Sequence, residues 1–264
     1  MGTFILTDEQ KDLQDLAKEF SDKEIRPISA EWDVIGDTPM ELYQKAAEMG
    51  FTAPALPEEY GGLGLSYQTQ AIINEQLSMG DVGFANALGA SQFACRPVLM
   101  AGTEAQKRYV VDTVCSGGLA SFALTEPSAG SDASALRTTA VRSGDEYILN
   151  GRKCFITNAP HAQFFCVFAK TDPSQGHRGI SCFLVERERA GVSVGKHEDK
   201  MGFRLATASD VILDEVHVPA DHLIGKENKG YHLAMQILDY SRIGVAAESV
   251  GLAQEALNLA VDYA

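Results

Sequence analysis

The stretch from Phe122 to Asp132 (Phe-Ala-Leu-Thr-Glu-Pro-Ser-Ala-Gly-Ser-Asp) most limits the folds open to this chain, because the sequence pattern changes there. It begins as an apolar run typical of a buried strand and continues into a turn rich in small hydroxyl residues and glycine. Such a turn can bring backbone N–H groups and side-chain hydroxyls close to a polar ligand. The stretch therefore lies where helical and strand patterns meet, a common location for a ligand site.

Capping residues and helix-stop residues predict a helical block before this stretch. Thr7 with Gln10 and Thr103 with Gln106 have the spacing of capping boxes. The predicted helices cover residues 7–33, 39–50, 66–79, 81–101 and 103–115. The glycine cluster at residues 61–64 lacks the spacing of a dinucleotide-binding loop and follows no strand, so a Rossmann fold is rejected.

Short β-rich runs alternate with turns from Leu119 to Pro219. The predicted strands cover residues 138–141, 147–149, 153–157, 164–170, 181–185 and 210–218. Asn150-Gly151 between two of these runs indicates a hairpin. Several short strands within about 100 residues predict an antiparallel sandwich or barrel.

The pattern becomes helical again from Glu227 to Ala264, and this last helix is unusually apolar. Its main apolar stripe consists of Ile243, Ala246, Ala247, Val250, Ala253, Leu257 and Ala260. A narrow polar face remains, formed by Glu248, Glu255, Asn258 and Asp262. We expect such a helix to be covered over most of its circumference.

The composition is that of a globular protein, with 45% hydrophobic and 22% charged residues. A net charge of −14 without a basic tract argues against binding to nucleic acids or to anionic membranes. The N-terminus has neither a basic region nor a long apolar segment, so we expect a cytoplasmic protein that does not span a membrane. Five scattered cysteines indicate free thiols, and six dispersed histidines predict no metal site.

Two motifs make the chain resemble the acyl-CoA dehydrogenase family. The first is Leu124-Thr125-Glu126-Pro127-x-x-Gly130-Ser131-Asp132, and the second is Lys153-Cys154-Phe155-Ile156-Thr157-Asn158. Weaker landmarks in the expected order extend the resemblance along the whole chain. The resemblance implies an α+β fold with an N-terminal all-α domain (1–118), a middle antiparallel β-barrel or sandwich domain (119–225) and the first helix (226–264) of an incomplete C-terminal helical bundle.

The resemblance also implies an activity. Family members bind FAD and dehydrogenate an acyl-CoA thioester between its α and β carbons, with an electron-transferring flavoprotein as the usual acceptor. The cofactor carries the redox chemistry, and the protein supplies orientation and electrostatics. A homo-oligomer, usually a homotetramer, is expected, or else a complex with a chain that carries the rest of the helical domain.

Site residues follow from the resemblance by position. The flavin wall is expected to consist of Phe122, Leu124, Thr125, Gly130, Ser131, Phe155, Ile156 and Thr157. The acyl-CoA contacts are expected from Ser131, Asp239, Tyr240, Ser241 and Arg242. Many family members have Trp at the position of Phe155, so we expect looser aromatic packing here. Spacing alone leaves open an intrahelical ion pair between Asp239 and Arg242.

No catalytic residue is assigned to this chain. In most family members the catalytic glutamate lies further downstream, and in some relatives it lies just before the helix arginine, where this chain has Ser241. A serine without an adjacent base does not accept an α-proton. We therefore expect the base from a segment beyond Ala264 or from a partner chain. The alternatives are a non-catalytic subunit of a heteromeric complex and a flavin acyl-CoA oxidase on the same fold.

Overall fold

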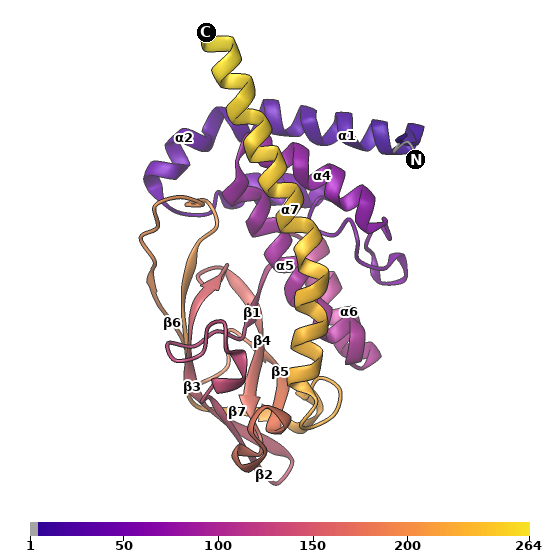
Figure 1. Cartoon of the computed structure of the whole chain (residues 1–264). Coiled ribbons are helices and arrows are strands. Elements are labelled where there is room, and N and C mark those ends of the chain that lie inside the picture. Colours follow the sequence, from indigo (N-terminus) through magenta and orange to yellow (C-terminus); the bar gives the residue numbers. More distant parts are fainter. Residues whose placement is uncertain (1–4) are drawn as a thin grey trace.

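The computed structural model describes residues 5–264 and has a helical part, a β part and a long last helix (Figure 1). The first helices are α1 (Asp8–Phe20), α2 (Arg26–Ile35), α3 (Met40–Glu48), α4 (Tyr67–Gly80), α5 (Val82–Ala101) and α6 (Glu104–Cys115). A π-helical segment, Ser21–Ile25, joins α1 to α2 just before Pro27. Both predicted capping boxes, at Thr7 and Thr103, are present, and the predicted helical block is confirmed.

The β part is one seven-stranded sheet with the strand order β1-β4-β2-β3-β7-β6, in which β5 pairs with β4. Its strands are β1 (Leu119–Ala123), β2 (Thr139–Ser143), β3 (Glu146–Thr157), β4 (Ala162–Lys170), β5 (Ile180–Glu186), β6 (Val192–His197) and β7 (Ala208–Pro219). The family fold is confirmed, but the sheet is mixed rather than purely antiparallel, because β4 runs parallel to β1 and β2. The β2–β3 hairpin lies between β1 and β4 in the chain and provides the long connection that a parallel pair needs.

The hairpin predicted at Asn150-Gly151 is wrong, because both residues lie inside β3. The turn between β2 and β3 is instead at residues 143–146, where Gly144 has a φ of +61°. Gly151 marks a register shift against β7, and a Cβ there would stand 2.3 Å from the Thr138 hydroxyl oxygen. Close backbone approach therefore explains this glycine, a second common use of glycine in strands.

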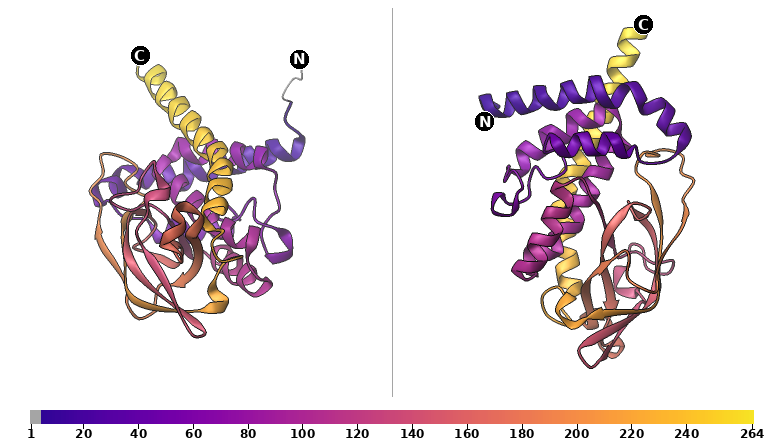
Figure 2. Two further views of the ribbon diagram at one scale, coloured as in Figure 1. Left: turned by 60° about the horizontal axis from the view of Figure 1, so that its bottom comes forward. Right: turned by 180° about the vertical axis from the view of Figure 1, so that it is seen from behind.

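Strand β4 places its side chains alternately in two cores, as the two-residue period of a strand requires. Phe164 and Phe168 face the core that the sheet shares with α5, α6 and the last helix. Phe165 and Val167 face a second core enclosed by the strands. The helical part is thus fixed to one side of the β part, as Figure 2 also shows.

The last helix, α7 (Gly230–Tyr263), runs along β5, α5 and α4 in turn (Figure 1). Gly251 lies so close to α4 that a Cβ would stand 2.1 Å from the carbonyl oxygen of Glu75. Contrary to expectation, the covered face includes Glu248 with Gly251, whereas much of the apolar side is exposed within residues 5–264. The exposed apolar side chains are Ile243, Val245, Val250, Leu252, Leu257, Leu259 and Val261.

Two further sequence predictions concern the state of the cysteines and the presence of membrane-spanning segments. The chain's cysteines are all free, and four of them are buried. Across residues 5–264, no helix is long and apolar enough to cross a membrane. Residues 1–4, which bear on a possible leader sequence, lie outside the described part of the chain.

Candidate functional site

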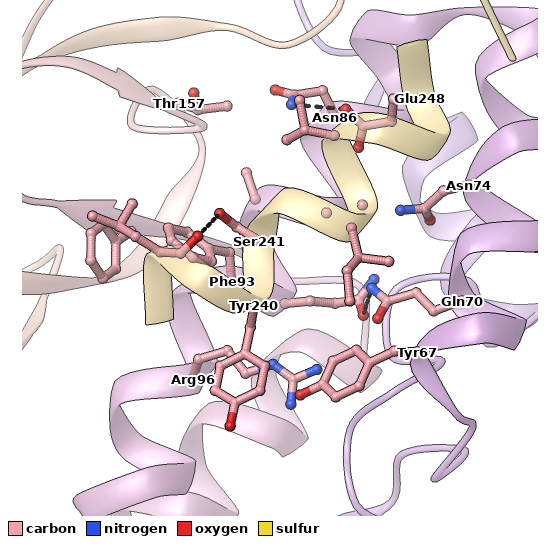
Figure 3. A pocket seen from close by; sticks show the side chains of 18 of the residues that line it. Tyr67, Gln70, Asn74, Asn86, Phe93, Arg96, Thr157, Tyr240, Ser241 and Glu248 are labelled. Atoms are coloured by element: carbon pink, nitrogen blue, oxygen red, sulfur yellow. Dashed lines mark hydrogen bonds between the residues drawn. The ribbon is translucent and has the colours of Figure 1, made fainter. Parts of the chain in front are cut away.

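A cavity of about 270 Å³ lies where β1 and β3 end against α4, α5 and α7. One side, the sheet end, is lined by Phe122, Thr125, Phe155, Ile156 and Thr157. The other side, the helical end, includes Asn74 of α4, Asn86 and Gly89 of α5, and Gly244 and Glu248 of α7. The cavity is therefore built from segments that are far apart in the sequence (Figure 3).

The sheet end presents unused hydrogen-bonding groups beside an aromatic ring. Within residues 5–264, the side chains of Thr125 and Thr157 make no hydrogen bond. Phe155 is 66% exposed and has a φ of +56°, a left-handed conformation that is uncommon for an aromatic residue. Strained residues of this kind concentrate at ligand sites. The sheet end is thus suited to a planar ligand with polar edges.

A buried ion pair between Glu126 and Lys153 joins the two sequence motifs behind the sheet end. Lys153 Nζ lies 2.7 Å from Glu126 Oε1 and also donates to the carbonyl oxygens of Leu124 and Phe168. Glu126 further accepts hydrogen bonds from the Thr138 hydroxyl and from two backbone N–H groups. Neither charged side chain reaches solvent, with 0% and 4% of their side-chain areas exposed.

The ion pair keeps its charges at neutral pH. Burial lowers the pKa of Lys153 to about 8, so the amine is still protonated at pH 7. Burial acts to raise the pKa of Glu126, but the Lys153 charge and the hydrogen bonds outweigh it and hold this pKa below its usual value. Because Cys154 N–H also donates to the Thr125 carbonyl at 3.0 Å, the two motifs are held in a fixed register.

The helical end contains a buried carboxyl group with little hydrogen bonding to offset the loss of solvent. Glu248 is 3% exposed, and its only hydrogen bond among the described residues is a long one, 3.4 Å from Asn86 Nδ2. Burial raises the pKa of Glu248 to about 7. Asn74 is 5% exposed, and its side-chain amide makes no hydrogen bond to any residue in 5–264.

A third part of the lining is an aromatic stack between the first residue of α4 and Tyr240, within α7. The rings of Tyr67 and Tyr240 lie 5.7 Å apart at an angle of 16°, and the Arg96 guanidinium lies 5.1 Å from the Tyr67 ring centre (Figure 3). Tyr240 is 45% exposed, so this stack borders solvent. It forms a positively charged, partly apolar edge to the cavity.

The structure brings together seven of the residues that the sequence predicts for the site. These are Phe122, Thr125, Phe155, Ile156, Thr157, Tyr240 and Ser241. Leu124 is buried beneath the sheet end, and Gly130 and Ser131 lie in an exposed turn beyond it. Asp239 and Arg242 are exposed on α7 outside the cavity lining. Among residues 5–264 these two form no ion pair with each other.

Sequence reasoning missed the cavity residues on α4 and α5 and assigned Glu248 only to a polar helix face. The missed helix residues include Tyr67, Gln70, Asn74, Asn86, Phe93 and Arg96. Asn86 interrupts an otherwise apolar helical segment, which was an available signal. A second available signal was the presence of opposite charges in the two motifs, Glu126 in the first and Lys153 in the second.

Comparison with known proteins gives the class of the chain. The sequence matches "Acyl-CoA dehydrogenase, N-terminal domain" over residues 7–118, "Acyl-CoA dehydrogenase, middle domain" over 121–216 and "Acyl-CoA dehydrogenase, C-terminal domain" over 228–264. It is 43% identical to a "3-(aryl)acrylate reductase" of Clostridium sporogenes, over 98% of this chain and 69% of the relative. It is 41% identical to the "Caffeyl-CoA reductase-Etf complex subunit CarC" of Acetobacterium woodii, over the same shares.

A solved structure agrees with these sequence matches. Butyryl-CoA dehydrogenase from Megasphaera elsdenii superposes with a TM-score of 0.95 at 40% identity, covering 99% of this chain and 70% of that one. The fold and cavity thus define a flavoprotein of the acyl-CoA oxidoreductase type. The chain belongs to the acyl-CoA dehydrogenase family, whose members are FAD-dependent oxidoreductases.

Proposed function

We propose that this chain provides the flavin wall and the acyl pocket for α,β-dehydrogenation of an acyl-CoA thioester to the 2-enoyl-CoA. The observation that carries the proposal is the cavity itself. Two free threonine hydroxyls and an exposed aromatic ring line its sheet end, and the cavity continues between three helices. Apolar cavities with a few polar groups are the usual form of small-molecule sites.

The sheet end fits a flavin. The Thr125 and Thr157 hydroxyls can each donate or accept a hydrogen bond at a polar ring edge, and Phe155 can pack on the ring system. FAD, when bound, supplies the hydride acceptor of the reaction. The Glu126–Lys153 pair holds the backbone on both sides of Thr125 and so keeps the orientation of its side chain fixed.

The α-proton requires a base that the sheet end does not provide. The Ser241 hydroxyl donates to the Leu238 carbonyl at 2.9 Å and makes no hydrogen bond to a basic side chain among residues 5–264. Glu248 is the one carboxylic acid among the cavity-lining residues, and it lies two helical turns from Ser241, on the order of 10 Å along the axis. We propose that the abstracting carboxylate comes from residues outside this sequence, on a further segment or on a partner chain.

A reduction assay tests this assignment. The 264-residue chain loaded with FAD is mixed with butyryl-CoA or octanoyl-CoA without oxygen, and the visible absorbance of the flavin is followed. We expect FAD to bind weakly and its absorbance to remain. Rapid bleaching by either thioester would show that the chain already holds its base. A failure of FAD to bind at any concentration would contradict the flavin wall.

The electron partner is proposed from the relatives. One of them is named as a subunit of an Etf complex, which supports an electron-transferring flavoprotein as partner of this chain also. Both relatives described above are named reductases, so the same pocket could serve the reverse reaction with a suitable donor. Oxygen consumption with acyl-CoA in the absence of any other acceptor would instead favour the oxidase alternative.

The strained aromatic residue provides a test of the flavin wall. In Phe155→Gly, loss of the ring contact is expected to weaken FAD binding about three- to tenfold, the equivalent of about 0.5–1.5 kcal/mol. The unfolding free energy should change by less than about 1 kcal/mol, because glycine relieves the left-handed conformation. FAD affinity by fluorescence titration and urea unfolding measure the two effects.

Phe203 is the matched control, because it has the same φ of +56° and lies outside the cavity. Phe203→Gly should leave FAD affinity unchanged, and Phe155→Trp should preserve it. Equal weakening of FAD binding by both glycine variants would mean that Phe155 does not contact the flavin.

A further inference from the structure

We propose that Glu248 and Asn74 recognise a hydroxyl group at the far end of the acyl chain, which makes this chain selective for acyl-CoA thioesters with a terminal hydroxyl. The inference rests on the proposed function, because it assigns the helical end of the same cavity to the acyl group. It concerns which acyl group binds rather than how the reaction proceeds.

The first support is the contrast between the two buried glutamates of the molecule. Glu126 accepts hydrogen bonds from Lys153, Thr138 and two backbone N–H groups, all between 2.6 and 3.0 Å. The Glu248 carboxyl is equally buried, but its only hydrogen bond within the described part of the chain is the 3.4 Å contact with Asn86. A buried carboxyl without such partners is costly, so a bound group that satisfies it would bind favourably.

The second support is that the residues next to the two polar atoms are glycines, which have no side chain to cover them. Glu248 Oε1 faces Gly89, where an added Cβ would stand 3.4 Å away. The amide nitrogen of Asn74 faces Gly244 at the same distance. Both glycines line the cavity together with Glu248 and Asn74. Figure 3 shows these two polar side chains at the helical end of the cavity. A ligand in the cavity can reach both.

The third support is the match of hydrogen-bonding roles. A hydroxyl donates one hydrogen bond and accepts others. The hydroxyl can donate a hydrogen bond to the Glu248 carboxyl, and its oxygen can accept a hydrogen bond from the Asn74 amide nitrogen. An aliphatic end would leave both groups without partners. An ammonium group would leave the Asn74 amide nitrogen without an acceptor.

Binding of matched thioesters tests the proposal. The probes are hexanoyl-CoA, 6-hydroxyhexanoyl-CoA and 6-aminohexanoyl-CoA, titrated by calorimetry into the FAD-loaded full chain and into its Glu248 variants. For the unmodified chain we expect the hydroxylated thioester to bind about fivefold more tightly than hexanoyl-CoA, because one additional net hydrogen bond is worth about 1 kcal/mol. In Glu248→Leu the order should reverse, and Glu248→Gln should keep part of the preference.

Glu255→Gln is the control, since Glu255 lies on the same helix outside this cavity. It should leave all three affinities unchanged, and thermal unfolding by circular dichroism shows that each variant is folded. Equal binding of the hydroxylated and parent thioesters, unaffected by Glu248→Leu, would overturn the inference and leave the proposed function intact. If the amino thioester bound most tightly, the group recognised by Glu248 would be a cation and the hydroxyl proposal would be wrong. If none of the three thioesters bound, both this inference and the proposed function would be overturned.

Discussion

Replacing Lys153 with methionine is expected to lower the unfolding free energy by about 3–5 kcal/mol, because it leaves the Glu126 carboxylate buried without its cation. The loss should exceed that of most single substitutions, which cost about 0.5–3 kcal/mol. Urea unfolding at pH 7 measures it. FAD binding should weaken as well, because the backbone carbonyl of Leu124, next to Thr125, loses its donor.

The neighbouring residue provides a matched control. Arg152 pairs with Asp210 on the surface, and its side chain is 62% exposed. Arg152→Met should therefore cost no more than about 1 kcal/mol. A double variant, Lys153→Met with Glu126→Gln, should recover part of the loss, because it removes the unpaired charge. Equal effects of Lys153→Met and Arg152→Met would contradict a stabilising role of the buried pair.

Stability is expected to fall by about 3 kcal/mol between pH 4.5 and 7 because of Glu248 alone. Burial raises its pKa from 4.5 to about 7 in the folded chain. Over this interval the unfolded chain has lost the proton that the folded chain retains, so rising pH favours unfolding. About one pH unit above 7 and beyond, both states are ionised and the contribution is constant. The other charged residue in the cavity lining is Arg96, at the aromatic stack.

The measurement is the difference in unfolding free energy between the unmodified chain and Glu248→Gln at several pH values. The difference should decline from pH 4.5 to 7, because the variant has no group that titrates at this position. Asp262→Asn is a suitable control, since Asp262 is exposed near the end of α7. Its difference curve should be flat. A flat curve for Glu248→Gln as well would mean that the carboxyl ionises as freely as in the unfolded chain.

Both predictions depend on residues whose burial the sequence does not reveal. Glu126 and Lys153 stand 27 positions apart, and each lies in a motif that could as well end in a solvated turn. Glu248 has helical spacing with Glu255 and Asp262, which predicts one polar face. Helix periodicity gives the side on which a residue lies, but it does not say which neighbour covers that side.

Some of the strands were also predictable from local sequence, and others were not. β4 and β5 are long apolar runs and were predicted from their composition. β6 was missed because Val192–His197 is largely exposed and carries few apolar residues, and its pairing with β7 holds it in the sheet. The parallel pairing of β1 with β4 was also beyond a local reading, since strand direction depends on the path of the connection.

Local sequence patterns are sufficient to predict the order of helical, strand and helical blocks, the capping boxes at Thr7 and Thr103 and the two motifs on which family membership rests. These features depend on local hydrogen bonding and on side-chain periodicity, which a few neighbouring residues specify. The pairing of Lys153 with Glu126 is visible only in the folded chain, and so is the cavity that Glu248 and Asn74 both line. Those contacts depend on how distant elements pack, and the cost of burying a charge or an amide is set only once that packing encloses it.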